Sequence, residues 1–281
     1  MRTALYVPGS SPRMIEKSRT LDADVVILDL EDAVSAGEKA SARAAVVDEL
    51  RREAPMRRWV RINPADSVEQ LADLEEIVPA GPDAIVLPKA DPDTIGRLDQ
   101  YLDAVSGDVG RVPVVALVET ARGLLEVAEL CRVGRRLVGL QLGAEDLTAE
   151  LGVERTVGGE EIRLARHQLA LAAHAHGLMA IDTPNLSIGD DDALRADILV
   201  ARSCGMTGKT CIHPSQLSAV AAAFRPARAE IAWAERVVVA AEQAAGAGKG
   251  AVALDGQMID APVVARARRV LREAGKNSIH S

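Results

Sequence analysis

Apolar and polar positions follow a regular pattern along most of the chain. From the first residues to about residue 225, short runs rich in Val, Ile and Leu are separated by longer amphipathic stretches. Such runs are typical of buried strands, and the stretches between them repeat their apolar residues with a helical period. Eight strands are predicted, over residues 4–7, 25–30, 59–62, 84–87, 114–119, 138–142, 179–182 and 210–212. Helices are predicted between them, as over residues 38–52, 121–131 and 160–176.

The repeated order of strand and helix predicts parallel strands joined by crossover helices, in a barrel or a doubly wound sheet. No GxGxxG or GxxxxGK[ST] turn follows an early strand, so nothing marks a nucleotide-binding open sheet. Polar residues instead follow many of the predicted strands, at the ends that surround one mouth of a barrel. We therefore predict an α/β fold, a (β/α)8 TIM barrel with a C-terminal helical extension.

The pattern changes after residue 226. An Ala-rich helix is predicted over residues 228–245, followed by a short strand over 251–254, a turn at Asp255 and Gly256, and a last helix over about 262–274. These elements lie beyond the eighth strand–helix unit. We expect a catalytic barrel domain over residues 1–226 and an extension over residues 227–281, packed on the barrel or on a neighbouring subunit.

Composition excludes several classes of protein. The 281 residues are 48% hydrophobic and 26% charged, which is typical of a soluble globular chain. A net charge of −8 and the lack of a basic stripe argue against nucleic acid as a partner. We also expect no membrane segment and a cytoplasmic location, since there is no secretory leader and no long apolar run. Three scattered cysteines suit a reducing compartment and form neither a disulfide framework nor a zinc motif.

Two carboxylates follow neighbouring predicted strands. Glu119 ends the run Leu117-Val118-Glu119, and Asp146 lies in the segment after Leu142. Two carboxylates at one barrel mouth repel each other unless a cation or a proton lies between them, and Mg2+ accepts one or two carboxylates with water and substrate oxygens. The alternative is a pair of helix N-terminal acids, because Asp and Glu favour that position. The occurrence of both on adjacent strands favours a metal site.

Charged residues also end the second and third predicted strands. Arg61 is placed to hold a substrate carboxylate in a two-pronged contact, or to pair with the acidic segment around Asp29, Glu31 and Asp32. Alternation places Asp29 and Glu31 on one side, where they would orient Arg61 or a metal ligand, or form a solvated loop. His213 follows the eighth strand and is more often structural than catalytic in such a position.

The ordered motifs resemble the citrate lyase β-subunit-like branch of the HpcH/HpaI aldolase family, over nearly the whole chain. The matching segments are LYVPG at residues 5–9 with Arg13, VILDLEDAV at 26–34 with Lys39 and Arg43, VRIN at 60–63, VLPK at 86–89, ALVETARG at 116–123, GAEDL at 143–147, CIHPSQ at 211–216 and DGQMIDAP at 255–262. No single motif is specific, and their order along the chain carries the resemblance.

The resemblance implies a trimeric or hexameric TIM barrel with Mg2+ (or Mn2+) held by Glu119 and Asp146. It implies that Arg61 contacts the 2-oxo acid or the acyl substrate. Glu31 is a further catalytic candidate, but from its place at the end of the second predicted strand and not from the resemblance. Asp260 matches an acid/base residue that reaches the site of a neighbouring subunit. The basic residues near the first two strand ends match contacts to CoA; they are Arg13, Lys39 and Arg43.

The resemblance further implies a carbon–carbon lyase. It would cleave, or form, a 3-hydroxy-acyl-CoA thioester of the citryl-, malyl- or citramalyl-CoA type, with a 2-oxo acid and an acyl-CoA on the other side. One alternative is the β subunit of a larger lyase that acts on a carrier-protein thioester. Another is a CoA-independent class II aldolase, against which the GAEDL and MIDAP segments argue. The motifs do not identify the acyl group or the direction of the reaction.

Overall fold

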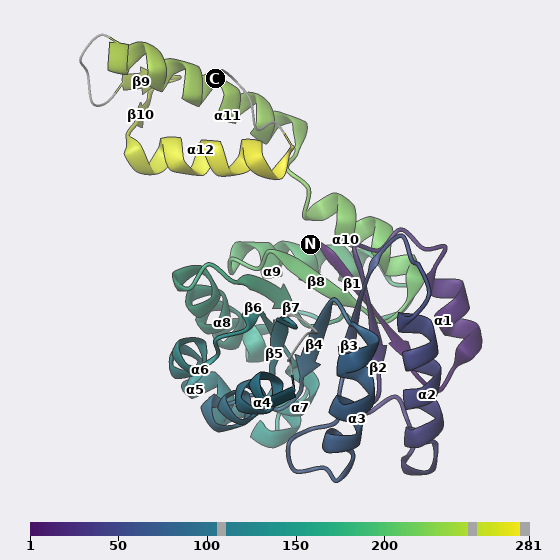
Figure 1. Cartoon of the computed structure of the whole chain (residues 1–281). Coiled ribbons are helices and arrows are strands. Elements are labelled where there is room, and N and C mark those ends of the chain that lie inside the picture. The colour runs from purple at the N-terminus through teal and green to yellow at the C-terminus, as the bar shows by residue number, and fades with distance from the viewer. Residues whose placement is uncertain (106–110, 247–251, 276–281) are drawn as a thin grey trace. The chain divides into compact units, whose positions relative to one another are not determined.

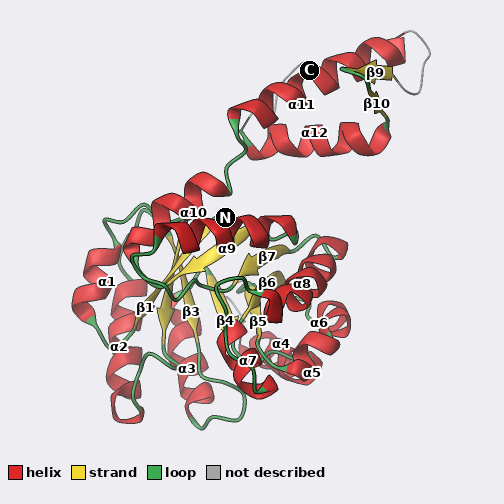
Figure 2. Cartoon of the chain, turned by 180° about the vertical axis from the view of Figure 1, so that it is seen from behind, coloured by secondary structure: helices red, strands yellow, loops and turns green. Residues whose placement is uncertain are grey.

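The computed structural model describes residues 1–105, 111–246 and 252–275, and it divides into two compact units, Met1–Ala221 and the part that begins at Ala222. The first unit is a closed barrel of eight parallel strands in sequence order, as predicted. Figure 2 shows these strands surrounded by helices. The strands are β1 (Thr3–Pro8), β2 (Val25–Asp29), β3 (Arg57–Arg61), β4 (Ala84–Leu87), β5 (Val114–Val118), β6 (Leu137–Leu142), β7 (Met179–Asp182) and β8 (Gly208–Cys211).

Helices follow the strands along the chain (Figure 1). They are α1 (Pro12–Ser18), α2 (Lys39–Leu50), α3 (Glu69–Ile77), α4 (Pro92–Val105), α5 (Ala121–Leu125), α6 (Val127–Val133), α7 (Ala144–Leu151), α8 (Arg163–Ala175), α9 (Asp191–Ser203) and α10 (Leu217–Ala223), with 3-10 turns η1 (Ala36–Glu38), η2 (Val78–Ala80), η3 (Glu160–Ile162) and η4 (Pro214–Gln216). The single helix predicted over residues 121–131 is two helices, because Glu126 leaves the helical conformation between them. None of the described helices is long and apolar enough to cross a membrane.

Apolar side chains fill the inside of the barrel. The interior cluster consists of Ala4, Val25, Ile27, Trp59, Ala84, Val86, Val115, Leu117 and Ile181. Successive residues of a strand point to opposite faces, so a residue two positions further on returns to the inside. The barrel is therefore a packed core below its mouth, and the next inward-facing layer is the one that a ligand can reach.

The second unit has its own small core. Helices α11 (Arg228–Gly246) and α12 (Ala261–Glu273) pack around buried residues such as Ala234, Val237 and Leu271. Between them, β9 (Val252–Leu254) and β10 (Gln257–Ile259) form an antiparallel hairpin. Asp255 and Gly256 both have positive φ, as the tight turn of such a hairpin requires, and this agrees with the predicted turn. Residue 251 of the predicted strand lies outside the described residues, and the packing partner of this unit stays a prediction.

Candidate active site

A layer of polar residues lies directly above the apolar interior of the barrel. Each of five strands places a polar side chain two residues beyond an inward-facing apolar one, which brings these side chains to the same mouth. They line one cavity of about 430 Å3, a volume that suits a small-molecule ligand. The layer consists of Tyr6, Asp29, Arg61, Glu119, Thr183 and, from β6, Gln141.

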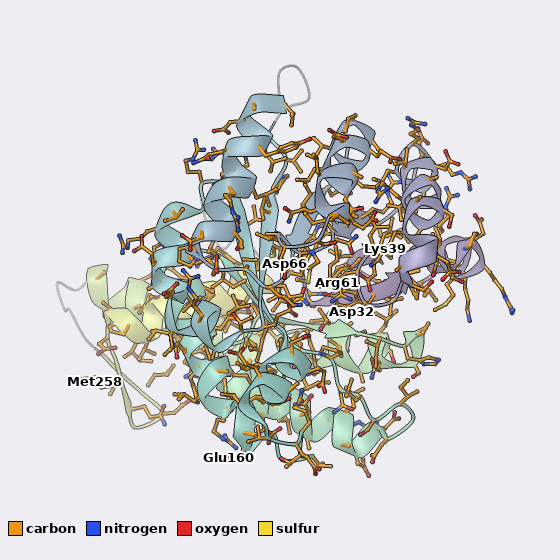
Figure 3. All side chains as sticks on the ribbon, turned by 90° about the horizontal axis from the view of Figure 1, so that it is seen from below. Asp32, Lys39, Arg61, Asp66, Glu160 and Met258 are labelled. Atoms are coloured by element: carbon orange, nitrogen blue, oxygen red, sulfur yellow. The ribbon has the colours of Figure 1, made fainter. Side chains whose placement is uncertain are left out.

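Arg61 is the cation of this layer. Its Nε and Nη2 bind the two carboxylate oxygens of Asp29 at 2.7 and 2.6 Å, and its Nη1 lies 3.3 Å from Asp32. Figure 3 shows Arg61 and Asp32 close to each other. The ring of Tyr6 covers the guanidinium, with Cζ 5.0 Å from the ring centroid. The predicted pairing with the acidic segment is thus present, and it orients an arginine that still lines the cavity.

Glu31 contacts Arg61 but is not one of the residues that line the cavity. Its Oε2 forms an ion pair with Arg61 Nη1 at 2.9 Å but makes no well-aligned hydrogen bond within the described residues. Burial raises the pKa of Glu31 to about 8, although Arg61 opposes the shift. Its contacts favour an effect through Arg61, and its predicted catalytic role stays a prediction.

Glu119 follows β5 and is held in a fixed orientation. Its Oε1 accepts a hydrogen bond of 2.8 Å from the backbone N–H of Lys89, whose φ of 48° is left-handed. The backbone at Gly143 passes close to the Glu119 side chain, and a Cβ at this position would lie only 2.6 Å from Glu119 Oε2. Burial, and then the negative charge of Asp146, raise the pKa of Glu119 to about 7.

Asp146 lies in the first turn of α7 and lines the same cavity. The adjacent Glu145 also lines it but pairs with Arg155 at 2.6 Å. Thr183 accepts a hydrogen bond of 3.3 Å from the N–H of Ala144, which ties the start of this helix to the end of β7. Of the two acids in the GAEDL motif, Asp146 is therefore the one without a basic partner among the described contacts.

These carboxylates fit a hard divalent cation. Within residues 1–105, 111–246 and 252–275, no three His, Cys, Asp or Glu side chains form a ready-made metal cage. Two carboxylates with open space beside them are what Mg2+ accepts, because it keeps several waters and substrate oxygens among its ligands. Burial is the main cause of the raised pKa of Glu119, and the negative charge of Asp146 adds to it, which is the repulsion that a cation between the two would relieve.

The three predicted CoA contacts differ in availability. Arg13 is exposed at the start of α1. Lys39 Nζ is held by the backbone oxygens of Leu30 and Glu31 and by Asn63, all within 2.8 Å. Arg43 is buried against three carboxylates of α3, which are those of Glu69, Asp73 and Glu76. The CoA role stays a prediction for all three, and the contacts favour Arg13.

Two further candidates act as helix caps. Asp260 Oδ1 accepts a hydrogen bond of 3.3 Å from the N–H of Val263 at the start of α12. His213 Nδ1 accepts from the N–H of Ser215 at 3.2 Å and forms a capping box with Gln216. These contacts give both residues a structural purpose, and the acid/base role of Asp260 stays a prediction.

Three residues that line the cavity were not predicted from the sequence, namely Tyr6, Gln141 and Thr183. Gln141 stands between Leu140 and Leu142 in a strand that is otherwise apolar, and this was the signal that it faces the barrel interior. Tyr6 is one of only two tyrosines in the chain. Tyr6 and Gln141 lie within strands, away from the strand ends where the predicted site residues lie, whereas Thr183 directly follows β7 and was missed there.

Comparison with known proteins gives concordant relatives. Citrate lyase subunit beta of Leuconostoc mesenteroides subsp. cremoris is 33% identical over 99% of this chain and 94% of its own. A (3S)-malyl-CoA thioesterase of Cereibacter sphaeroides is 38% identical over 97% and 94%. The structure of CitE from Mycobacterium tuberculosis with magnesium, acetoacetate and coenzyme A matches with a TM-score of 0.82 and 36% identity, over 98% of both chains.

The model of the family described as HpcH/HpaI aldolase/citrate lyase matches residues 2–214. That range contains all eight strands of the barrel and most of the motifs on which the resemblance rested. The resemblance is confirmed, and this chain belongs to the HpcH/HpaI aldolase/citrate lyase family.

Proposed function

We propose that this chain is a Mg2+-dependent carbon–carbon lyase. It cleaves, or forms, a 3-hydroxy-acyl-CoA thioester of the citryl-, malyl- or citramalyl-CoA type. The observation that carries the proposal is one cavity at the mouth of the barrel that is lined by Arg61 and by two carboxylates, those of Glu119 and Asp146. A guanidinium and a divalent cation together suit the adjacent hydroxyl and carboxylate oxygens of such a substrate.

In the cleavage direction, the hydroxyl group loses its proton and its carbon becomes the ketone of a 2-oxo acid. The electrons of the breaking carbon–carbon bond move to the α-carbon of the thioester, which then takes up a proton and leaves as acyl-CoA. When bound, Mg2+ supplies polarisation of the hydroxyl and ketone oxygens. Glu119 and Asp146 would hold it, and Arg61, fixed by Asp29, would bind the carboxylate and stabilise charge at the same oxygens.

Asp260 is the proposed acid for the α-carbon, supplied by a neighbouring copy of the chain in a homotrimer or hexamer. Arg13 is the proposed contact to CoA. We also place the protein in the cytoplasm, because all three cysteines are free and buried, which suits a reducing compartment. Sedimentation of the purified protein tests the assembly, and a monomer would rule out a site shared between copies.

The names of two relatives support specific alternatives. Citrate lyase subunit beta suggests a chain that works in a complex, on a carrier-protein thioester. The name (3S)-malyl-CoA thioesterase suggests hydrolysis of the thioester bond instead of the carbon–carbon bond. These activities differ in their products, because hydrolysis releases free CoA thiol and no 2-oxo acid.

The test is to incubate the purified chain with citryl-CoA, malyl-CoA and citramalyl-CoA, each with Mg2+ or with EDTA. The 2-oxo acid and the free thiol are measured separately. EDTA-sensitive release of a 2-oxo acid without thiol is the expected result. Thiol release alone would support a thioesterase. If none of the three CoA esters gives a product but a carrier-protein thioester is cleaved, the result would support a subunit of a lyase complex.

A further inference from the structure

Tyr6 and Gln141 form a hydrogen bond across the inside of the barrel. Gln141 Nε2 donates to Tyr6 Oη at 2.7 Å, although β6 and β1 are not neighbours in the barrel. Both residues line the cavity that holds Arg61 and Glu119. The bond therefore crosses the floor of the candidate active site.

This pair has hydrogen-bonding capacity that the protein does not use. Gln141 is 2% exposed, and its Oε1 is buried without a partner among the residues that the structure describes. Oη is the acceptor in the bond to Gln141, and no contact among the described residues gives the phenolic hydrogen of Tyr6 an acceptor. Turning the amide would let Oε1 accept the phenolic hydrogen and would place an N–H donor where Oε1 now lies. In either orientation of the amide, an N–H or O–H group of the pair is left without an acceptor.

The pair lies beside the group that binds the substrate acid. The face of the Tyr6 ring covers the Arg61 guanidinium, so its oxygen lies at the edge of the same binding region. Burial raises the pKa of Tyr6 well above its usual value, which keeps the phenol a donor. Buried polar groups are nearly always hydrogen-bonded in folded proteins, so an unused one that lines a cavity suggests a ligand.

We infer that Tyr6 and Gln141 form a specificity site that donates a hydrogen bond to an additional oxygen on the 2-oxo acid half of the substrate. The inference rests on the proposed function and narrows it. The specificity site would favour a thioester whose cleavage yields a dicarboxylic 2-oxo acid. It would disfavour a thioester that carries a methyl group in place of the carboxymethyl group. A methyl group beside the pair would leave buried polar atoms unpaired, and pockets built for a hydrogen bond discriminate strongly against such ligands.

Citryl-CoA and citramalyl-CoA provide a matched pair of substrates, because they differ only in a carboxymethyl or a methyl group on the reacting carbon. The variants are Tyr6→Phe, which keeps the ring over Arg61, and Gln141→Met, which keeps the length of the side chain. Tyr101→Phe, on α4, is the control for loss of a phenolic oxygen elsewhere. The wild type should prefer citryl-CoA in kcat/KM.

In each variant, the ratio of kcat/KM for citryl-CoA to that for citramalyl-CoA should fall by about ten- to a hundredfold, the equivalent of one buried hydrogen bond. The double variant should lose no more than the larger single loss, because both changes remove one interaction. Tyr101→Phe should keep the wild-type ratio. An unchanged ratio in both variants, or equal losses on both substrates, would overturn the inference.

A binding measurement separates this inference from the proposed function. Malate and lactate differ by the same carboxymethyl and methyl groups, and their binding with Mg2+ present can be measured by calorimetry without turnover. If no thioester is cleaved, a malate preference that Tyr6→Phe abolishes would preserve the specificity site while the lyase proposal fails. If thioesters are cleaved and the variants behave like the wild type, the lyase proposal stands alone. Equal binding of malate and lactate by an inactive wild type would overturn both.

Discussion

Two clusters of charged side chains in the barrel unit differ in the balance of their charges. The helix-side cluster, Arg166, Asp182, Asp197 and Lys209, pairs two cations with two anions. Lys209 Nζ lies 2.5 Å from Asp182 and 2.7 Å from Asp197, and Arg166 contacts the same two acids. The mouth cluster, Asp29, Glu31, Asp32, Arg61, Glu119 and Asp146, has one cation for five carboxylates.

The pKa values reflect this difference. Burial would raise the pKa of Asp197, but Lys209 and Arg166 outweigh it and hold the value below the usual one. In the mouth cluster burial prevails, and the pKa values of Glu31 and Glu119 rise to about 8 and about 7. A balanced cluster is complete without a ligand. The mouth cluster has an excess of negative charge that a bound cation would neutralise. It is therefore the better candidate for a site of chemistry.

The largest expected effect is on stability, in the helix-side cluster. Lys209→Met leaves two buried carboxylates with a single cation, and breaking a buried ion pair in this way costs about 3–5 kcal/mol. Urea unfolding of the full chain measures this change. Lys17→Met, at an exposed position on α1, is the control and should change stability by less than about 0.5 kcal/mol. A loss below about 1 kcal/mol for Lys209→Met would contradict the structural role of the cluster.

The next effect is on activity, in the mouth cluster. Glu119→Gln and Asp146→Asn should each lower kcat/KM by about a hundredfold or more, since each removes a metal-binding carboxylate. The metal-free stability should stay the same or rise, because one source of repulsion disappears. Glu145→Gln is the matched control beside Asp146, and its loss should be much smaller. Similar losses for Glu145→Gln and Asp146→Asn would mean that the carboxylates act by general electrostatics.

A smaller effect concerns pH. Glu31 has a folded-state pKa of about 8 against an ordinary value near 4.5. Between these two pH values the carboxyl group of Glu31 is protonated in the folded protein and ionised in the unfolded chain. This contribution to stability is fully present below about pH 4.5 and is lost as the pH rises through 8. Unfolding of the metal-free protein between pH 5 and 9 should therefore show a decline that Glu31→Gln makes shallower. A steeper fall of stability with pH in the variant would mean that folding lowers the pKa of Glu31 instead of raising it.

The smallest effect concerns Asp260, in the second unit. Asp260→Ala removes the cap of α12 and should lower the stability of that unit by about 1 kcal/mol. Asp260→Asn keeps a capping oxygen, so its stability should match the wild type. Hydrogen exchange of α12 measures both changes. A large loss of activity in Asp260→Asn would support the acid/base role, and full activity would leave the residue as a cap only.

The sequence was sufficient to predict the fold, because a barrel repeats one local pattern. Each strand is a short apolar run, and each helix has its own period, so eight units could be counted. The division at Glu126 was not predicted, because one residue that leaves the helical conformation does not disturb the periodicity. The family was also predicted correctly, because motif order is visible in the sequence.

Charged residues that end or follow strands gave most of the predicted site, and Asp146 was found in the segment after the sixth strand. Asp29, Arg61 and Glu119 were found in this way, and all three line the cavity. Gln141 lies within β6, so its inward direction follows from the alternation along that strand and not from a place at a strand end. Arg43 matched a CoA contact in the motif, but only the folded chain places three acids of α3 around it.

The most direct test is the equilibrium binding of Mg2+ to the purified chain, measured by calorimetry with a 2-oxo acid present. The unbalanced charge of the mouth cluster predicts one site per chain, lost in Glu119→Gln and in Asp146→Asn and retained in Glu145→Gln. Equal binding by all four proteins, or no binding by the wild type, would contradict the assignment of the mouth cluster as a metal site.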